Sequence, residues 1–195
     1  MEKIEQTELY SLEQYARIRE DFRAGVMQHK KHRQLPIGPH LTLYFEDRMT
    51  IQYQIQEMLR VEKIFEEAGI RDELDAYNPL IPDGSNLKAT MMIEYERSEE
   101  RATRLAEMVG IEDAVWLQVD ALDKIMAVAD EDLERATEDK TSAVHFLRFE
   151  FTGEMIKALR DGARLSAGVE HAAYSHVIES VPEDIRNSLI GDFDS

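Results

Sequence analysis

The chain has 195 residues, a length that suits one domain whose core buries roughly two-thirds of the unfolded surface. Its 40 Asp and Glu against 23 Lys and Arg give a formal net charge of −17, which disfavours nucleic acid and anionic lipid as partners. The absence of cysteine excludes disulfides, a thiol nucleophile, zinc ribbons and cysteine-ligated iron–sulfur clusters, and it fits the cytosol.

The N-terminal segment 1–5 is acidic and lacks the apolar core of a signal peptide. No later stretch approaches the roughly 18 consecutive apolar residues of a membrane span. We therefore expect a cytoplasmic protein that is neither exported nor embedded in a membrane.

A first helix is predicted over residues 12–33. Ser11 and Gln14 form a capping box, in which each side chain satisfies a backbone N–H at the helix start. Apolar residues then recur at helical spacing until the proline-containing segment 36–39, which cannot continue a helix. The apolar face comprises Tyr15, Ile18, Phe22 and Val26.

A second helix is predicted to begin between Asp47 and Thr50 and to run to Gly69. Each of the two helices has one apolar face, and the connection is too short for a long crossover, so we expect them to pack antiparallel. The second apolar face comprises Ile51, Ile55, Met58, Val61, Phe65 and Ala68.

After turn signals at residues 78–84, the periodicity changes to the two-residue alternation of half-buried strands. Six strands are expected, at residues 89–95, 114–119, 125–128, 142–151, 163–171 and 174–181. Short helices are expected between them, at residues 98–109, 130–137 and 154–159.

These elements predict an α+β fold, in which an N-terminal two-helix layer packs on a largely antiparallel sheet with short connecting helices. The helical part covers about residues 1–75 and the mainly sheet part about residues 88–195. The chain has no internal repeat and no low-complexity linker, so we expect a single domain over residues 1–195. The loop at 71–88 is the one plausible seam.

Strong catalytic signatures are missing from the sequence. It contains no Walker loop, dinucleotide glycine fingerprint, nucleophile elbow or His-Glu-x-x-His motif. None of the six histidines follows a glutamate by three residues, so the Glu-x-x-His pairs of ferritin-like di-iron sites are absent.

Polar residues on the apolar face of the second helix form the first candidate site. Gln54, Glu57 and Glu62 lie within that apolar arc, where a carboxylate needs a partner. Glu57 and Glu62 could pair with a basic residue of the first helix or hold a metal ion together with His29 or His40. For the structural pairs, the basic candidates are Arg23, Lys30 and Arg33.

The two late strands suggest a second candidate site. Alternation places His145 and His171 on the same strand faces as apolar residues, so both rings can point toward the core. Ordinary core or rim histidines are one interpretation. The functional interpretation has them converge with Tyr174 on a pocket, as acid–base or ligand groups.

Several segments carry a family resemblance: residues 29–33 (HKKHR), 38–43 (GPHLTL), 45–48 (FEDR), 54–62 (QIQEMLRVE), 146–149 (FLRF) and 171–174 (HAAY). In these segments the chain resembles the bacterial domain-of-unknown-function family three-five-zero-one over nearly its whole length. That family has no established activity and no catalytic residues to carry over.

The resemblance implies a functional setting, because members of the family are often encoded beside rubrerythrin-like proteins and iron–sulfur proteins related to heterodisulfide reductase. It implies an accessory or binding protein of peroxide, redox or iron metabolism, with such a redox protein as partner. The alternative is a metal-dependent enzyme or small-molecule binder that uses a His/Glu pocket between the first two helices. The cofactor, enzymatic activity and homo-oligomerisation are left open.

Overall fold

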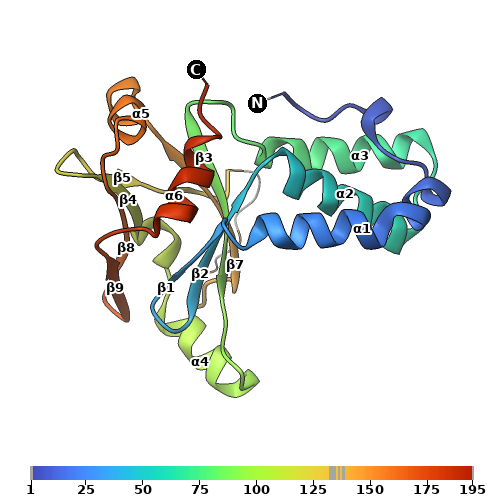
Figure 1. Cartoon of the computed structure of the whole chain (residues 1–195). Helices are drawn as coiled ribbons and strands as arrows, with labels where there is room; N and C mark the ends of the chain where they lie inside the picture. The colour runs from blue at the N-terminus through green and yellow to red at the C-terminus, as the bar shows by residue number, and fades with distance from the viewer. Residues whose placement is uncertain (1, 132–134, 136, 138, 195) are drawn as a thin grey trace.

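The computed structural model describes residues 2–131, 135, 137 and 139–194. It has the predicted α+β fold: a helical layer, a five-stranded sheet and a four-stranded sheet, both antiparallel (Figure 1). Half of the helix expected at 130–137 lies outside the described residues, and the other four residues are not helical. None of the described helices has the length and apolar character needed to cross a membrane.

The helical layer lies on one side of the five-stranded sheet (Figure 1). The layer consists of η1 (Gln6–Glu8), α1 (Leu12–Lys30), α2 (Arg48–Glu62), α3 (Glu67–Tyr77) and η2 (Asn78–Leu80). Helices α1 and α2 begin where predicted: Ser11, the predicted cap, accepts a hydrogen bond from the backbone of Gln14, and Asp47 accepts one from that of Thr50.

Helices α1 and α2 pack antiparallel, as predicted. Contacts near the start of α1 are made with the later part of α2, and contacts near the end of α1 are made with the start of α2. Tyr15 and Arg19 contact Glu57, whereas His29 contacts Asp47. The prediction of one helix to Gly69 is wrong. Lys63 has a left-handed backbone with φ 55°, which ends α2 at Glu62, and α3 follows as a separate helix.

The five-stranded sheet has the order β1-β2-β3-β7-β6. Its first hairpin lies within the segment expected to be helical and was not predicted, because Pro36 and Gly38 indicate only a connection. Pro36 fits there because β1 is an edge strand, and Gly38 has φ 75° at the turn. The strands are β1 (Gln34–Ile37), β2 (Leu41–Glu46), β3 (Asn86–Ile93), β6 (Val128–Ala129) and β7 (Val144–Glu150).

The four-stranded sheet has the order β5-β4-β8-β9. The single strand expected at 125–128 is wrong, because the chain leaves one sheet after Met126 and enters the other at Val128. The strands are β4 (Val115–Val119), β5 (Ile125–Met126), β8 (Leu165–His171) and β9 (Tyr174–Ile178). The remaining helices are α4 (Ser98–Glu107), η3 (Ile111–Ala114), α5 (Gly153–Arg160) and α6 (Glu183–Ile190), of which η3 and α6 were not predicted.

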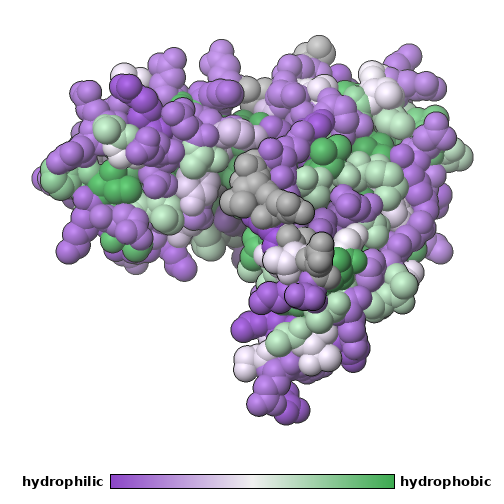
Figure 2. All heavy atoms as spheres, turned by 180° about the vertical axis from the view of Figure 1, so that it is seen from behind, coloured by the Kyte–Doolittle hydropathy of each residue, from purple (hydrophilic) through white to green (hydrophobic). Residues whose placement is uncertain are grey.

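The main core fills the space between the two sheets, where alternate residues such as Leu43, Met91, Phe149, Leu117 and Val169 are buried. A smaller apolar cluster lies within the helical layer. The five-stranded sheet therefore has the main core on one face and the helices on the other. Seen from behind, the outer surface is mostly hydrophilic, with hydrophobic residues in small separate groups (Figure 2), in keeping with the net charge of −17.

Candidate functional site

A cavity of about 630 Å³ lies between the helical layer and the five-stranded sheet. This volume is within the range of pockets that bind small organic molecules. Its apolar lining comes from Met27, Ile51, Leu80, Met92, Val144 and Phe146, and its polar lining from Lys30, Gln34, Tyr44, Glu46, Thr50, Gln54, Tyr77, Thr90 and Glu94.

The floor of the cavity is a set of aligned positions on four neighbouring strands. Gln34 pairs with Tyr44, Tyr44 with Thr90, and Thr90 with Phe146. Because side chains alternate along a strand, these residues face the helices while their neighbours fill the main core. The sheet register therefore brings together residues separated by up to about a hundred positions, and the first turns of α2 cover them.

The carboxylate of Glu46 lines this cavity and is held in place by two hydrogen bonds. Its Oε2 accepts a hydrogen bond from Thr50 Oγ1 at 2.5 Å, and its Oε1 accepts one from Thr90 Oγ1 at 2.7 Å. Lys88 is the residue opposite it across the strand pair, but the Lys88 ammonium donates to the backbone oxygen of Pro79 instead. The carboxylate is thus half-buried and held by hydroxyl groups.

Two further groups set the electrostatics of the cavity. Lys30 is half-buried, and its Nζ lies 5.8 Å from the centre of the Tyr53 ring, a cation–π distance. Burial raises the pKa of the Tyr44 hydroxyl, and the nearby charge of Glu94 raises it further. Tyr44 is therefore a neutral hydrogen-bonding group at physiological pH.

Of the residues predicted from the second helix, Gln54 lines the cavity and Glu57 does not. Glu57 receives hydrogen bonds from Arg19 Nε at 2.7 Å, Arg19 Nη2 at 2.8 Å and the Tyr15 hydroxyl at 2.7 Å. The hydrogen bonds from Arg19 are the main reason that the pKa of Glu57 falls to about 2. The predicted partners Arg23, Lys30 and Arg33 are wrong, because Arg19 lies opposite Glu57 in the antiparallel pair.

Glu62 is exposed, so its predicted burial is wrong. The buried part of α2 ends with Leu59, and the residues of its last turn after Leu59 are exposed. Helical periodicity places Glu62 on the apolar face, but it does not show how far along the helix that face is covered.

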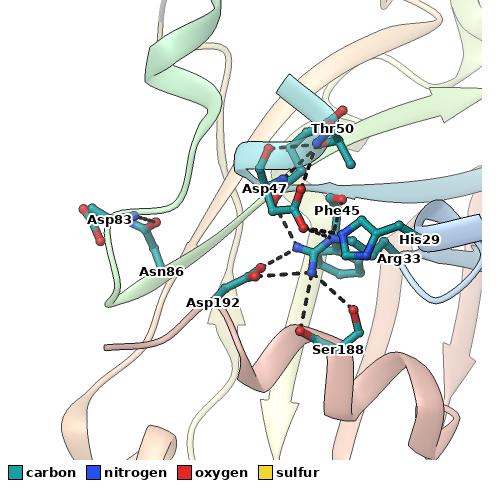
Figure 3. A network of polar contacts seen from close by, with 10 residues as sticks. His29, Arg33, Phe45, Asp47, Thr50, Asp83, Asn86, Ser188 and Asp192 are labelled. Atoms are coloured by element: carbon teal, nitrogen blue, oxygen red, sulfur yellow. Dashed lines mark hydrogen bonds and ion pairs between the residues drawn. The ribbon is translucent and has the colours of Figure 1, made fainter. Parts of the chain in front are cut away.

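His29 belongs to a buried network rather than to a pocket with Glu57 (Figure 3). Its Nε2 lies 2.5 Å from Oδ2 of Asp47, and the same carboxylate oxygen lies 3.4 Å from Nε of Arg33. The Arg33 guanidinium also binds Asp192 and the backbone and hydroxyl of Ser188. The network ties the end of α1 and the start of α2 to the C-terminal segment.

The carboxylates of this network have opposite pKa shifts. Burial raises the pKa of Asp192 to about 6, despite its contact with Arg33. Although burial also acts on Asp47, its pKa is lowered by the charge of Arg33 and by hydrogen bonds from Thr50 and His29. Arg33 divides its charge between the two carboxylates, so burial has the larger influence on the pKa of Asp192.

His40 lies at the turn between β1 and β2, where its ring stacks on Tyr95 with centroids 3.9 Å apart. Its Nδ1 is 3.0 Å from the backbone oxygen of Glu94. The predicted metal site of His29, His40, Glu57 and Glu62 is therefore not assembled, since the first three residues have separate partners and Glu62 is exposed. Across the part of the chain that the structure describes, no group of three His, Cys, Asp or Glu residues could hold a metal ion.

His145 does point into the core and is fully buried. Its Nδ1 lies 2.5 Å from Asp130 Oδ2, and its Nε2 lies 2.8 Å from Thr141 Oγ1, which donates to Glu112 Oε2 at 3.0 Å. These four side chains form a polar cluster that satisfies the buried ring.

His171 and Tyr174 have different neighbours from His145. His171 is half-buried, with its Nε2 3.1 Å from the backbone oxygen of Val109. The Tyr174 hydroxyl donates to the backbone oxygen of Ile37 at 2.7 Å and accepts from the amides of His40 and Leu41. The structure therefore does not bring the three residues to one pocket, and Tyr174 holds the β1–β2 turn.

Most of the cavity was missed in the sequence because its floor depends on the unpredicted hairpin. A signal was present: Leu41, Leu43 and Phe45 alternate with the polar residues Thr42 and Tyr44. That alternation is typical of a strand with one face in a core.

Comparisons with known proteins give a family but no activity. A family described as "Protein of unknown function (DUF3501)" matches residues 3–193, which confirms the resemblance expected from the sequence. A crystal structure of a novel protein of unknown function from Burkholderia pseudomallei K96243 is 52% identical, with a TM-score of 0.94 over 99% of this chain and 100% of that one. A search of curated proteins gave no significant match.

Proposed function

The chain belongs to the DUF3501 family, and we propose that it binds a small organic molecule in the cavity between α1, α2 and the five-stranded sheet. The proposal rests on the volume of this cavity and on its lining of both apolar and charged side chains. A cavity of about 630 Å³ combines apolar side chains with a hydroxyl-held carboxylate and a lysine. Such mixed lining is characteristic of ligand sites, in which apolar surface supplies affinity and a few polar groups fix orientation.

The proposal keeps the predicted small-molecule pocket near the first two helices but changes its residues. Gln54 is retained, whereas Glu46 and Lys30 take the place of the predicted His/Glu set. The predicted link with peroxide or iron metabolism, and with a rubrerythrin-like or iron–sulfur partner, stays a prediction, because neither the fold nor the comparisons bear on it.

Filling the cavity tests the proposal. Val144 lies on its floor, so Val144→Trp places an indole in the ligand space, and Met92→Trp is a second variant with the same purpose. Val177→Trp is the matched control, because Val177 is 55% exposed on the other sheet. A library of small organic molecules is screened against each protein by thermal shift.

We expect hits that raise the melting temperature of the wild type and of Val177→Trp but not of a folded cavity variant. Hits that stabilise Val144→Trp and Met92→Trp as much as the wild type would place binding elsewhere and overturn the proposal. A screen without hits on the wild type would also overturn it.

A further inference from the structure

Two opposite charges line the cavity without a charged partner. Glu46 is held by the hydroxyls of Thr50 and Thr90, and the ammonium of Lys30 lies 5.8 Å from the centre of the Tyr53 ring. Within residues 2–131, 135, 137 and 139–194, neither group makes an ion pair. Half-buried charges of this kind lose solvation without gaining a countercharge, and a ligand can supply what is missing.

Both charges lie at the same end of the cavity. Glu46 immediately precedes the cap of α2 and contacts Thr50 in the first turn of that helix. Lys30 is the last residue of α1, and its ammonium is near Tyr53, one helical turn beyond Thr50. The described residues include no ion pair between them, so a ligand with both charges can pair with each group.

Apolar side chains lie further along the sheet from Glu46, with the lining residue Glu94 two positions after Met92. Met92 pairs with Val144 across β3 and β7, and Phe146 lies on the next aligned row, so the three form one continuous apolar surface. Leu80 of η2 lines the same cavity. A ligand that fills the site needs an apolar body as well as charged groups.

We infer that the ligand is an α-amino acid with an apolar side chain, its ammonium on Glu46, its carboxylate near Lys30 and its side chain on Met92, Val144 and Phe146. The inference rests on the proposed function. An uncharged ligand would cover both charges without pairing either, and a simple amine would leave Lys30 unpaired. Phosphates and dicarboxylates would meet Glu46 and Glu94 in a chain of net charge −17.

The charge requirement can be tested with matched probes by calorimetry. L-Phenylalanine carries both charges, phenethylamine only the ammonium and 3-phenylpropanoate only the carboxylate; L-leucine is a second zwitterion. We expect both amino acids to bind. Each single-charge analogue should bind at least about 10-fold more weakly than L-phenylalanine, because it loses one charge-assisted contact.

Two substitutions assign the charges to residues. Lys30→Met should weaken L-phenylalanine and 3-phenylpropanoate about 10-fold and leave phenethylamine unchanged, whereas Glu46→Gln should weaken L-phenylalanine and phenethylamine and leave 3-phenylpropanoate unchanged. Lys31→Met and Glu96→Gln are the controls, since both residues are exposed and neither lines the cavity. Neither control should alter any affinity.

The outcomes separate this inference from the proposed function. If neither amino acid binds, or if one single-charge analogue binds as tightly as L-phenylalanine, the ligand class is wrong. The cavity function survives that result if other molecules still distinguish the wild type from Val144→Trp. If both amino acids bind Val144→Trp and Met92→Trp as tightly as the wild type, both proposals fail.

Discussion

Both terminal nitrogens of Arg33 bind the carboxylate of Asp192, although the two residues are 159 positions apart in the chain. Their side chains are only 2% and 3% exposed. Arg33 also donates to the backbone oxygens of Phe45 and Glu46, directly before α2. One guanidinium thus connects the strand that carries Glu46 to the C-terminal segment.

Arg33→Met should lower the free energy of unfolding by roughly 3–5 kcal/mol at pH 7, because it leaves buried carboxylates without their cation. Urea unfolding measures the change. The control is Arg48→Met, which removes the partially exposed pair with Glu8 and should cost at most about 1 kcal/mol. Equal losses in the two variants would show that the Arg33 network contributes no more than a surface pair.

Asp192→Asn should reveal the raised pKa of Asp192 in the pH dependence of stability. Its folded pKa of about 6 exceeds the ordinary value of 3.8, so the folded state binds this proton more tightly. The resulting stabilisation is fully present below about pH 3.8 and is lost as the pH rises through 6. Asn cannot titrate, so the wild type should lose stability relative to the variant between pH 4 and 7, by on the order of 1–3 kcal/mol.

Urea unfolding of both proteins at several pH values checks this difference. The difference in unfolding free energy between the two proteins should change from pH 4 to 7. If that difference stays constant, or if the wild type gains stability relative to the variant, burial is not the dominant influence on the pKa of Asp192.

Glu57→Gln should reduce stability while leaving cavity binding unchanged, because Glu57 pairs with Arg19 outside the cavity. We expect a loss of about 1–2 kcal/mol at pH 7. Since its folded pKa of about 2 is below the ordinary 4.5, the contribution is present above pH 4.5 and is lost as the pH falls through 2.

The difference in unfolding free energy between wild type and Glu57→Gln should therefore shrink on acidification below pH 4.5. Glu62→Gln is the control, because Glu62 is exposed and should show no such effect. A Glu57→Gln protein that is as stable as wild type but fails to bind cavity ligands would favour the predicted functional role instead.

Tyr174→Phe should loosen the β1–β2 hairpin that carries part of the cavity floor. The lost hydroxyl leaves the oxygen of Ile37 and the amides of His40 and Leu41 without this partner, at a cost of about 1–3 kcal/mol. Urea unfolding gives the total, and amide hydrogen exchange at Leu41 should quicken. Tyr10→Phe is the control, because Tyr10 is 39% exposed. If the two variants lose the same stability and show the same amide exchange at Leu41, the Tyr174 hydroxyl does not stabilise the hairpin.

Local signals in the sequence were enough for the α+β class and for much of the element order. The capping residues Ser11 and Asp47 mark helix starts in the sequence and in the structure, because a cap depends on residues within one turn. Strand alternation likewise located β3, β4, β7, β8 and β9, with shifted ends.

The candidate site was less predictable, because its residues meet only through long-range pairing. The sequence shows Gln54 as a polar residue within an apolar arc, but Thr90 and Phe146 line the same cavity only through the register of β3 and β7. His29 and Glu57 share a helix pair but bind Asp47 and Arg19, since local periodicity gives a face and not a partner.

The sequence by itself determined the helix caps, the alternation of most strands, the absence of thiol chemistry and the strong negative charge. These properties depend on composition or on neighbours a few residues away. Only the tertiary structure decided that Glu46 and Lys30 line one cavity and that Arg33 meets Asp192. Such meetings depend on strand order, register and helix packing, which are set by the burial of the whole core rather than by any one segment.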